Sequence, residues 1–316
     1  MVEPHHEPAV ETTAEPVQQE TRCGFVALIG APNAGKSTLI NALVGSKVSI
    51  VTPKVQTTRA LIRGIAIEGA SQLIFVDTPG IFAPRRRLDR AMVGTAWGST
   101  QDADLVALLI DSKKGFGEDE AAIVGPLAEI RAPKVLVLNK VDLIAKPELL
   151  ALTHTLNERA SFAATFMISA LSGNGVGDLK SWFAAHVPAG PWLYPEDQIS
   201  DAPLRQLAAE ITREKLYLRL HQELPYQSTV ETEVWKELRD GSVRIEQTIY
   251  VERESQRKIV LGKAGQAIKA IGAAARADIA EAIEQPVHLF LHVKVREGWG
   301  DDPERYREMG LEFPKE

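Results

Sequence analysis

Short apolar runs alternate with amphipathic stretches over the N-terminal part of this 316-residue chain. The runs are rich in Val, Ile and Leu, which is typical of strands buried on both faces of a parallel sheet. The segments that we predict as strands are residues 25–29, 62–67, 73–76, 105–110, 135–138 and 165–168. Helical stretches between them, such as residues 118–130 and 148–160, predict an α/β fold with a mostly parallel sheet and helices on both faces.

The pattern changes after a Pro- and Gly-rich stretch at residues 188–195, which marks a linker. The predicted elements that follow are an amphipathic helix over 203–224, strands over 229–238 and 243–251 joined by a hairpin turn, and a last strand over 288–295. Between the last two strands, Gly-Lys-Ala-Gly at residues 262–265 separates two helical pieces. These elements predict a second domain of α+β type.

This pattern divides the chain into segments. We expect a first domain at 23–189, a linker at 190–202, a second domain at 203–300 and a C-terminal tail at 301–316. Residues 1–22 hold five glutamates against one arginine and no sustained apolar run, so we expect a disordered acidic tail. They also lack the basic start and apolar centre of a signal peptide.

The cysteine content, the apolar runs and the charge distribution limit the class of protein to which this chain can belong. Cys23 is the single cysteine, which excludes an intrachain disulfide, and no stretch approaches the roughly 20 apolar residues of a membrane span. The formal net charge of −6 argues at first against nucleic acid. Residues 253–276, however, hold six basic residues and one acidic residue, a local balance of +5. A focused patch of this kind can bind phosphates on an otherwise acidic protein.

The first predicted strand runs into Gly-Ala-Pro-Asn-Ala-Gly-Lys-Ser at residues 30–37, ahead of a helical run. Such a loop directs backbone N–H groups and a helix N-terminus at one point, which suits a polyphosphate. Lys36 would reach the outer phosphates and the Ser37 hydroxyl would bind Mg²⁺. A plain glycine-containing turn is the alternative, disfavoured by Lys-Ser at this spacing. The nucleotide-binding residues predicted here are Asn33, Ala34, Gly35, Lys36, Ser37 and Thr38.

A second motif, Asn-Lys-Val-Asp at residues 139–142, favours guanine over adenine. The Asp142 carboxylate can accept from the adjacent N1–H and 2-amino groups of guanine, and adenine offers no such pair of donors. Asn139 can serve the N7 side of guanine and the stem of Lys140 can cover the base. Ser-Ala-Leu at 169–171 also follows a strand, and the Ala170 N–H is the best candidate donor to guanine O6. The predicted base-site residues are Asn139, Lys140, Asp142, Ser169, Ala170 and Leu171.

Between these motifs, Asp-Thr-Pro-Gly at residues 77–80 follows another strand. Asp77 can hold the hydration shell of Mg²⁺, and the Gly80 N–H can reach a γ-phosphate. The sequence Asp-Thr-Pro-Gly is, however, also typical of a simple turn. In Gln-Thr-Thr-Arg at 56–59, we favour Thr58 as a Mg²⁺ ligand that binds only when the γ-phosphate is present. The predicted Mg²⁺ ligands are Ser37, Thr58 and Asp77, and the predicted catalytic residues are Lys36, Thr58 and Gly80.

Together, the five motifs resemble those of the bacterial Era family of GTPases, and the resemblance extends to nearly the end of the chain. It implies GTP and GDP as ligands, Mg²⁺-dependent hydrolysis and a phosphate-loop GTPase domain. Ile81 stands where Ras-like proteins carry a water-orienting Gln, so we expect slow intrinsic turnover by another device. Relatives with Asn at the place of Asn33 often bind K⁺. Either Asn33 contributes to a K⁺ site or it only orders the loop, and the sequence leaves both open.

The second domain resembles a KH domain in the bacterial, type II arrangement. Its Gly-x-x-Gly turn would bring bare backbone against a nucleic-acid backbone, and the adjoining apolar groove would hold unstacked bases. Taken alone, Gly-x-x-Gly also fits an ordinary helix cap. The predicted RNA-binding residues are Arg257, Lys258, Gly262, Lys263, Ala264, Gly265 and Lys269.

By resemblance, the expected function is a GTP-driven switch that binds the 3′ region of 16S rRNA and assists assembly of the 30S ribosomal subunit. We expect a cytoplasmic monomer, and peripheral association with the inner membrane stays open. The alternative from a different class is a regulatory interaction protein, signalling or membrane-peripheral. In that alternative, the KH-like domain would mainly bind protein, and the nucleotide site would be only a conformational switch.

Overall fold

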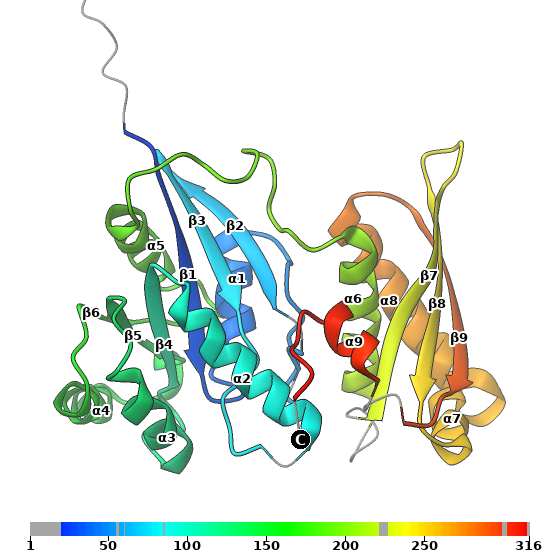
Figure 1. Ribbon diagram of the computed structural model, residues 1–316. Helices are drawn as coiled ribbons and strands as arrows, with labels where there is room; N and C mark the ends of the chain where they lie inside the picture. Colours follow the sequence, from blue (N-terminus) through cyan, green and yellow to red (C-terminus); the bar gives the residue numbers. More distant parts are fainter. Residues whose placement is uncertain are drawn as a thin grey trace, which may run out of the picture.

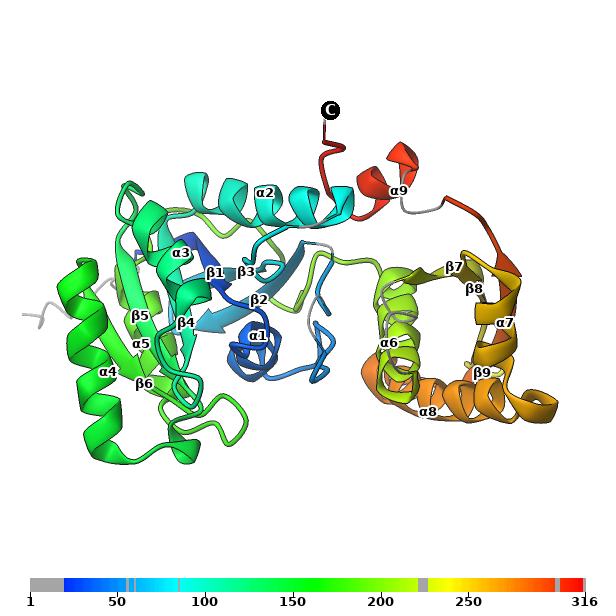
Figure 2. The ribbon, with the colours of Figure 1, turned by 90° about the horizontal axis from the view of Figure 1, so that it is seen from below.

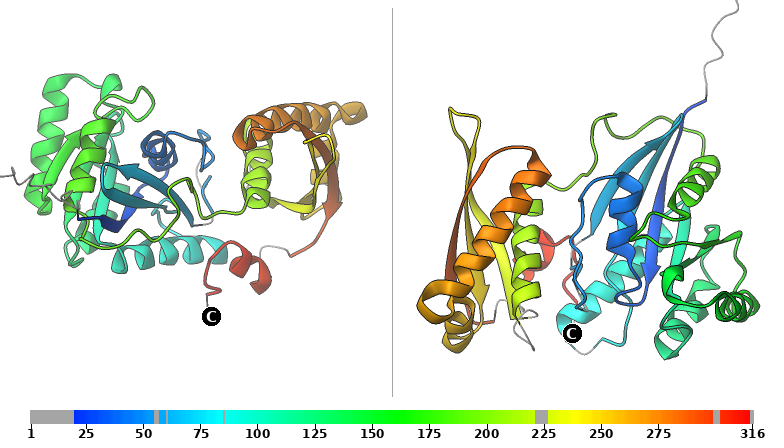
Figure 3. Two further views of the ribbon diagram at one scale, coloured as in Figure 1. Left: turned by 90° about the horizontal axis from the view of Figure 1, so that it is seen from above. Right: turned by 180° about the vertical axis from the view of Figure 1, so that it is seen from behind.

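The computed structural model describes residues 20–54, 57–59, 61–84, 86–220, 227–298 and 302–314. Two layered units lie side by side, joined by the linker and by the C-terminal segment (Figures 1 and 3). Of the earlier expectations, nearly all of the acidic tail, Gln56 and the end of the 203–224 helix lie outside the described residues.

The first unit is built on a six-stranded sheet of order β2-β3-β1-β4-β5-β6. Its strands are β1 (Arg22–Gly30), β2 (Ile62–Glu68), β3 (Ser71–Asp77), β4 (Leu105–Asp111), β5 (Lys134–Asn139) and β6 (Ala164–Met167). Only β2 runs antiparallel to its neighbour. The six strands predicted from apolar runs are therefore confirmed. The expected disordered tail is wrong at its last residue, because Arg22 already pairs with Ser71.

Helices cover both faces of this sheet, as predicted. One face is covered by α1 (Lys36–Val44) and α5 (Val176–His186). The other is covered by α2 (Arg87–Gln101), α3 (Glu118–Leu127) and α4 (Lys146–Arg159). Buried Val, Ile and Leu side chains of β1, β4 and β5 alternate between the two resulting cores. This packing fixes the carboxyl ends of the parallel strands, where ligands bind in open α/β sheets.

The second unit has a three-stranded sheet of order β7-β8-β9. Its elements are α6 (Leu204–Arg219), β7 (Ser228–Glu237), β8 (Val243–Val251), α7 (Glu254–Leu261), α8 (Gln266–Ile283) and β9 (Val287–Val295). Strands β7 and β8 are antiparallel and form the predicted hairpin, whereas β8 and β9 are parallel. Apolar side chains of the three helices pack on one face of the sheet. Helix α6 faces the first unit, and α7 lies on the remote side (Figures 1 and 2).

The C-terminal segment returns to the first unit rather than trailing away. It contains the short helix α9 (Pro303–Glu308), and Tyr306 and Leu311 are buried against Ala91 and Met92 of α2. From the sequence alone, this segment is expected only to be a C-terminal tail. Among the described residues, no helix has the length and apolar character needed to cross a membrane.

Candidate functional site: a phosphate and metal site beside a guanine-reading edge

A cavity of about 510 Å³ lies at the carboxyl end of the first sheet. Its lining comes from the 30–37 loop, the start of α1, residues 50–54, Thr57, Thr58, Gly80, Asp111 and Lys140. Among the lining residues are Asn33, Gly35, Lys36, Ser37, Thr38, Thr58 and Gly80, all of which the sequence predicted. The structure therefore brings the phosphate and metal motifs together in one place.

Two glycines have conformations or surroundings that a side chain would disturb. Gly35 has φ +99°, and a Cβ there would lie 2.2 Å from Asn139 Nδ2. Gly80 packs against the loop so closely that a Cβ would lie 2.8 Å from the backbone of Pro32. Glycine at these positions therefore allows Gly35 to pack against Asn139 and Gly80 to pack against Pro32.

The Lys36 side chain is almost fully buried within the loop. Its ammonium group donates to the carbonyl oxygens of Gly30 at 3.0 Å and Ala31 at 3.1 Å. Burial lowers the pKa of Lys36 to about 8, although the nearby Asp77 favours the charged form. A buried cation with few competing partners is suited to bind a polyphosphate strongly.

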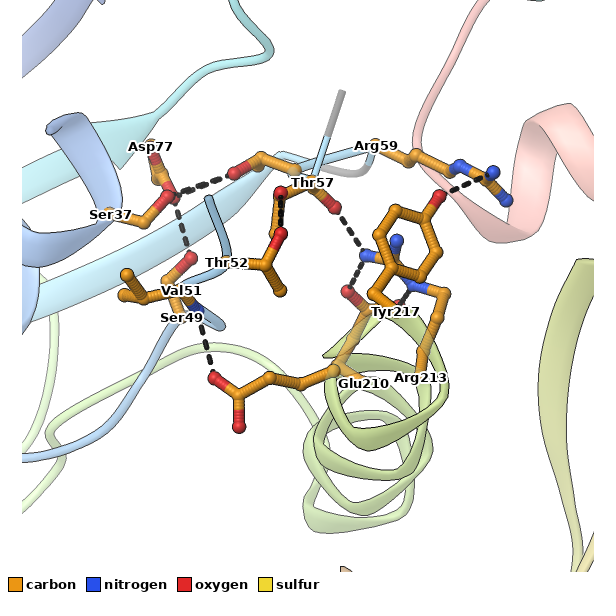
Figure 4. A network of polar contacts seen from close by, with 12 residues as sticks. Ser37, Ser49, Val51, Thr52, Thr57, Arg59, Asp77, Glu210, Arg213 and Tyr217 are labelled. Carbon is orange, nitrogen blue, oxygen red and sulfur yellow. Dashed lines mark hydrogen bonds and ion pairs between the residues drawn. The ribbon is translucent and has the colours of Figure 1, made fainter. Parts of the chain in front are cut away.

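Hydroxyl groups converge on Asp77, which is fully buried (Figure 4). Its Oδ2 accepts from Ser37 at 2.9 Å, Ser49 at 2.6 Å and Thr58 at 3.4 Å, and the Ser37 and Thr58 hydroxyls lie 2.9 Å apart. Burial raises the pKa of Asp77, and these hydrogen bonds oppose the shift. Its other oxygen, Oδ1, is buried without a hydrogen-bond partner.

This oxygen-rich group fits a small hard cation. Mg²⁺ prefers carboxylate and hydroxyl oxygens, and the orphaned Oδ1 of Asp77 leaves acceptor capacity beside the phosphate loop. The three predicted Mg²⁺ ligands, Ser37, Thr58 and Asp77, lie within hydrogen-bond distance of one another. Ser49, which belongs to none of the predicted motifs, was missed by the sequence analysis.

The Ile81 side chain is buried in the core between the sheet and α2, and its N–H donates to Gly30 O at 3.0 Å. It therefore helps to pack the loop and presents no polar group to the cavity. This is consistent with the expectation that hydrolysis does not use the residue at this position to orient water.

Asn139 links three of the predicted motifs. Its amide donates to Ala34 O at 2.9 Å, and its Oδ1 accepts from the N–H groups of Lys140 at 2.8 Å and Ala170 at 3.0 Å. The Ala170 N–H, expected to serve guanine O6, is thus engaged with Asn139 in this structure. The sequence predicts a base-binding role for Asn139, whereas its role as a brace between segments depends on tertiary contacts.

The other base-site residues lie at the same edge. Asp142 is exposed in the short helix η1 (Val141–Leu143), and the side chain of Leu171 is 88% exposed, whereas Ser169 is buried. Lys140 adopts a left-handed conformation, with φ 62°, and its ammonium group binds Asp111 Oδ2 at 2.6 Å and Asn33 O at 2.7 Å. Asp111, at the end of β4, is a further residue that the sequence analysis did not single out.

The Asn33 side chain has a defined partner. Its Nδ2 donates to Pro53 O at 3.1 Å, and its backbone has φ 63°. This contact joins the phosphate loop to the segment that carries Thr58. It is the loop-ordering role that the sequence left open for Asn33.

The Gly-x-x-Gly turn lies between α7 and α8 on the side of the second unit remote from the cavity (Figures 1 and 2). It contains three residues with positive φ, namely Gly262 (72°), Ala264 (51°) and Gly265 (74°). A Cβ on Gly262 would lie 2.6 Å from Ala267 Cβ. The turn therefore needs glycine at its start, and it exposes Lys263 and Ala264.

The predicted RNA-binding side chains divide into two groups. Lys258, Lys263 and Lys269 are exposed around the turn. Arg257 is half-buried, pairing with Glu254 at 2.8 Å and donating to Val293 O at 3.2 Å, so it also holds α7 against β9. Ile271, on α8 after the turn, is buried in the core.

Comparison with known proteins places these features in one family. Over 296 residues the chain is 70% identical to GTPase Era of Afipia carboxidovorans, covering 94% of this chain and 96% of that protein. The chain belongs to the Era family of GTPases. GTPase Era of Rhizobium meliloti is 69% identical over 295 residues, which are 93% of this chain and 94% of the relative. Residues 25–140 match the family described as 50S ribosome-binding GTPase, and 223–300 match the KH domain family.

Solved Era structures resemble both units together. One is the crystal structure of Era in complex with MgGDPNP and nucleotides 1506–1542 of 16S ribosomal RNA, with a TM-score of 0.86, 36% identity and coverage of 92% of this chain and 99% of that one. A variant of Aquifex aeolicus Era bound to GDP.AlF4⁻ gives the same values. The predicted fold class is confirmed: an Era-family GTPase domain is followed by a KH domain.

Proposed function

We propose that this GTPase binds the 3′ region of small-subunit ribosomal RNA through its KH domain and assists assembly of the 30S subunit. The observation that carries the proposal is the match, over 92% of the chain, to an Era that holds nucleotides 1506–1542 of 16S ribosomal RNA. The exposed lysines at the Gly-x-x-Gly turn support it, because they provide positive charge where a nucleic-acid backbone would approach.

Ribosomal RNA crosslinking in cells, followed by sequencing of the attached RNA, tests this proposal. Reads concentrated at the 3′ end of 16S rRNA are expected, with co-purification of small subunits that is lost on salt washing. The alternative, a regulatory protein at a membrane, predicts instead partition with anionic phospholipid vesicles and no enrichment of ribosomal RNA. We propose a cytoplasmic monomer, and the vesicle experiment also tests peripheral association with the inner membrane.

In the nucleotide site, we propose that Lys36 binds the β- and γ-phosphates and that the Gly80 N–H reaches the γ-phosphate. Ser37, Thr58 and Asp77 would hold Mg²⁺, which neutralises charge on the phosphates. Because Thr58 lies in a different segment from Ser37 and Asp77, it would bind the Mg²⁺ only when the γ-phosphate is present. GTP would then act as a timer whose hydrolysis releases the segment.

Asp142→Asn should exchange guanine preference for xanthine preference. An amide at this position loses one acceptor for the N1–H and amino group of guanine, but it can donate to the 2-oxo group of xanthine. We expect GTP affinity to fall about 100-fold and xanthosine triphosphate affinity to rise by a similar factor. Both affinities can be measured by competition against a fluorescent nucleotide. Equal binding of ATP and GTP by the parent protein would contradict the assignment.

We also propose that K⁺ assists hydrolysis at a site that includes Asn33, as in relatives with Asn at this position. Asn33 belongs to the phosphate loop, and its side chain contacts Pro53 of the segment that carries Thr58. Replacing K⁺ by Na⁺ at constant ionic strength should slow turnover several-fold without changing GDP affinity. An unchanged rate would leave Asn33 with only the loop-ordering contact.

A further inference from the structure

Helix α6 of the KH domain contacts the GTPase-domain segment that carries Thr58. Lys47 pairs with Glu214 at 2.7 Å, and the Val51 N–H donates to the same carboxylate at 2.9 Å. Lys54 donates to the carbonyl oxygens of Tyr217 and Leu220 at the C-terminal end of α6. Lys47, Val51 and Lys54 thus contact a helix that belongs to the other domain, and Figure 4 shows Val51 beside this helix.

Arg213 is the central member of this interface. Its side chain is 2% exposed, and its guanidinium group forms a two-pronged pair with Glu210, 2.8 Å from Nε to Oε1. Burial disfavours its charge, but Glu210 more than compensates, so the pKa of Arg213 lies above its ordinary value. From this fixed position the guanidinium donates to Thr57 O at 2.6 Å.

The other neighbour of Thr58 is held by the same domain. The buried Arg59 donates to the Tyr217 hydroxyl at 2.6 Å and to Ser228 O at 2.9 Å. Thr58 therefore lies between two residues that are fixed by the KH domain. Its own hydroxyl meets Ser37 at 2.9 Å and Asp77 at 3.4 Å.

We propose that Arg213 is a positioning residue for GTP hydrolysis. By holding the Thr57 carbonyl, it fixes the Thr57–Thr58 peptide so that the Thr58 hydroxyl reaches the oxygen cluster around Asp77. The KH domain then completes the metal site of the GTPase domain, and displacement of α6 withdraws Thr58 from that site. This inference rests on the proposed role of Thr58 as a Mg²⁺ ligand.

Arg213 and Thr57 differ in how firmly they are held, and this difference indicates that the KH domain controls the loop. Arg213 is fixed by Glu210 and by the core of the KH domain, whereas Thr57 belongs to a loop that connects α1 to β2. Movement of the KH domain would therefore be transmitted to the loop through a short charge-assisted hydrogen bond. Outer partners of this kind commonly change metal affinity or activity about 10- to 100-fold when removed.

The test compares Arg213→Gln with Arg213→Lys in the full-length protein. Arg213→Gln should lower kcat about tenfold and raise the Mg²⁺ concentration for half-maximal hydrolysis about tenfold. GDP affinity should stay within about twofold, because Thr58 acts only with the γ-phosphate. Arg213→Lys keeps a charge beside Glu210 and one donor, so it should be intermediate. It provides the same comparison if the Gln variant does not fold.

A matched control is Lys47→Gln, which removes the ion pairs with Glu214 and Asp278 from the same interface but leaves the Arg213–Thr57 hydrogen bond in place. It should hydrolyse GTP like the parent protein. The decisive measurement repeats Arg213→Gln in a Thr58→Ala background, where it should cause no further loss. Additive losses would mean general destabilisation, and normal Mg²⁺ dependence in Arg213→Gln would also overturn the inference. If Thr58→Ala itself has no effect, the proposed metal role of Thr58 fails. The proposed positioning role of Arg213, which acts through Thr58, then fails as well.

Discussion

Lys36→Ala is expected to lower the rate of GTP hydrolysis by about 10³-fold or more, with little change in the fold. The ammonium group is buried and held by Gly30 O and Ala31 O, so its position is fixed before a phosphate arrives. Its low pKa, about 8, indicates that the charge is poorly solvated in this loop. The negative charge of a bound polyphosphate would compensate the poorly solvated positive charge of Lys36. This compensation makes the contact strong.

Single-turnover hydrolysis at saturating Mg²⁺ measures this effect, with circular dichroism to verify folding. Removing a buried cation leaves only small loop adjustments, so the thermal unfolding midpoint of the nucleotide-free variant should not fall. Lys180→Ala is the matched control, because this lysine pairs with Glu68 at the end of β2 and has no predicted role in the site. A Lys36→Ala variant that hydrolyses GTP within tenfold of the parent rate would refute the assignment.

The sequence was sufficient where the chemistry depends on neighbours along the chain. The phosphate loop and the segment from Asp77 to Gly80 follow strands directly, so an apolar run and a few residue types predict where they lie. The parallel sheet followed for the same reason, since buried strands carry continuous Val, Ile and Leu runs. The Gly-x-x-Gly turn could also be predicted from adjacent residues, because Gly262 and Gly265 adopt the positive φ angles that glycine permits.

Contacts between distant segments were not predictable in this way. Ser49 reaches Asp77 across 28 positions, and no motif distinguishes it from other loop serines. Arg213 and Glu214 look like ordinary charges on an amphipathic helix, and only tertiary packing buries them against the GTPase domain. Likewise, Tyr306 and Leu311 lie in a short polar segment whose docking on α2 depends on apolar surface from another domain.

Changing both Lys263 and Ala264 to Asp should abolish RNA binding while leaving GTP hydrolysis intact. The double change makes the turn more negative by three charges where the RNA backbone is expected, and affinity should fall about 100-fold or more at low salt. Both side chains are exposed, and Asp tolerates the left-handed conformation at position 264, which has φ 51°. Gly262 and Gly265 stay unchanged, so the turn should keep its geometry.

Binding to a fragment from the 3′ end of 16S rRNA, measured by filter retention at two salt concentrations, decides the prediction. Arg239→Asp provides a control charge reversal on the exposed hairpin at the other end of the KH domain, and it should bind nearly normally (Figure 1). Basal hydrolysis should be unchanged in both variants, because the turn lies on the side of the KH domain away from the cavity. If the double variant bound the fragment as tightly as the parent at both salt concentrations, the turn would not be the RNA contact. The proposed role of the KH domain would then have to be withdrawn, even though the fold itself is not in question.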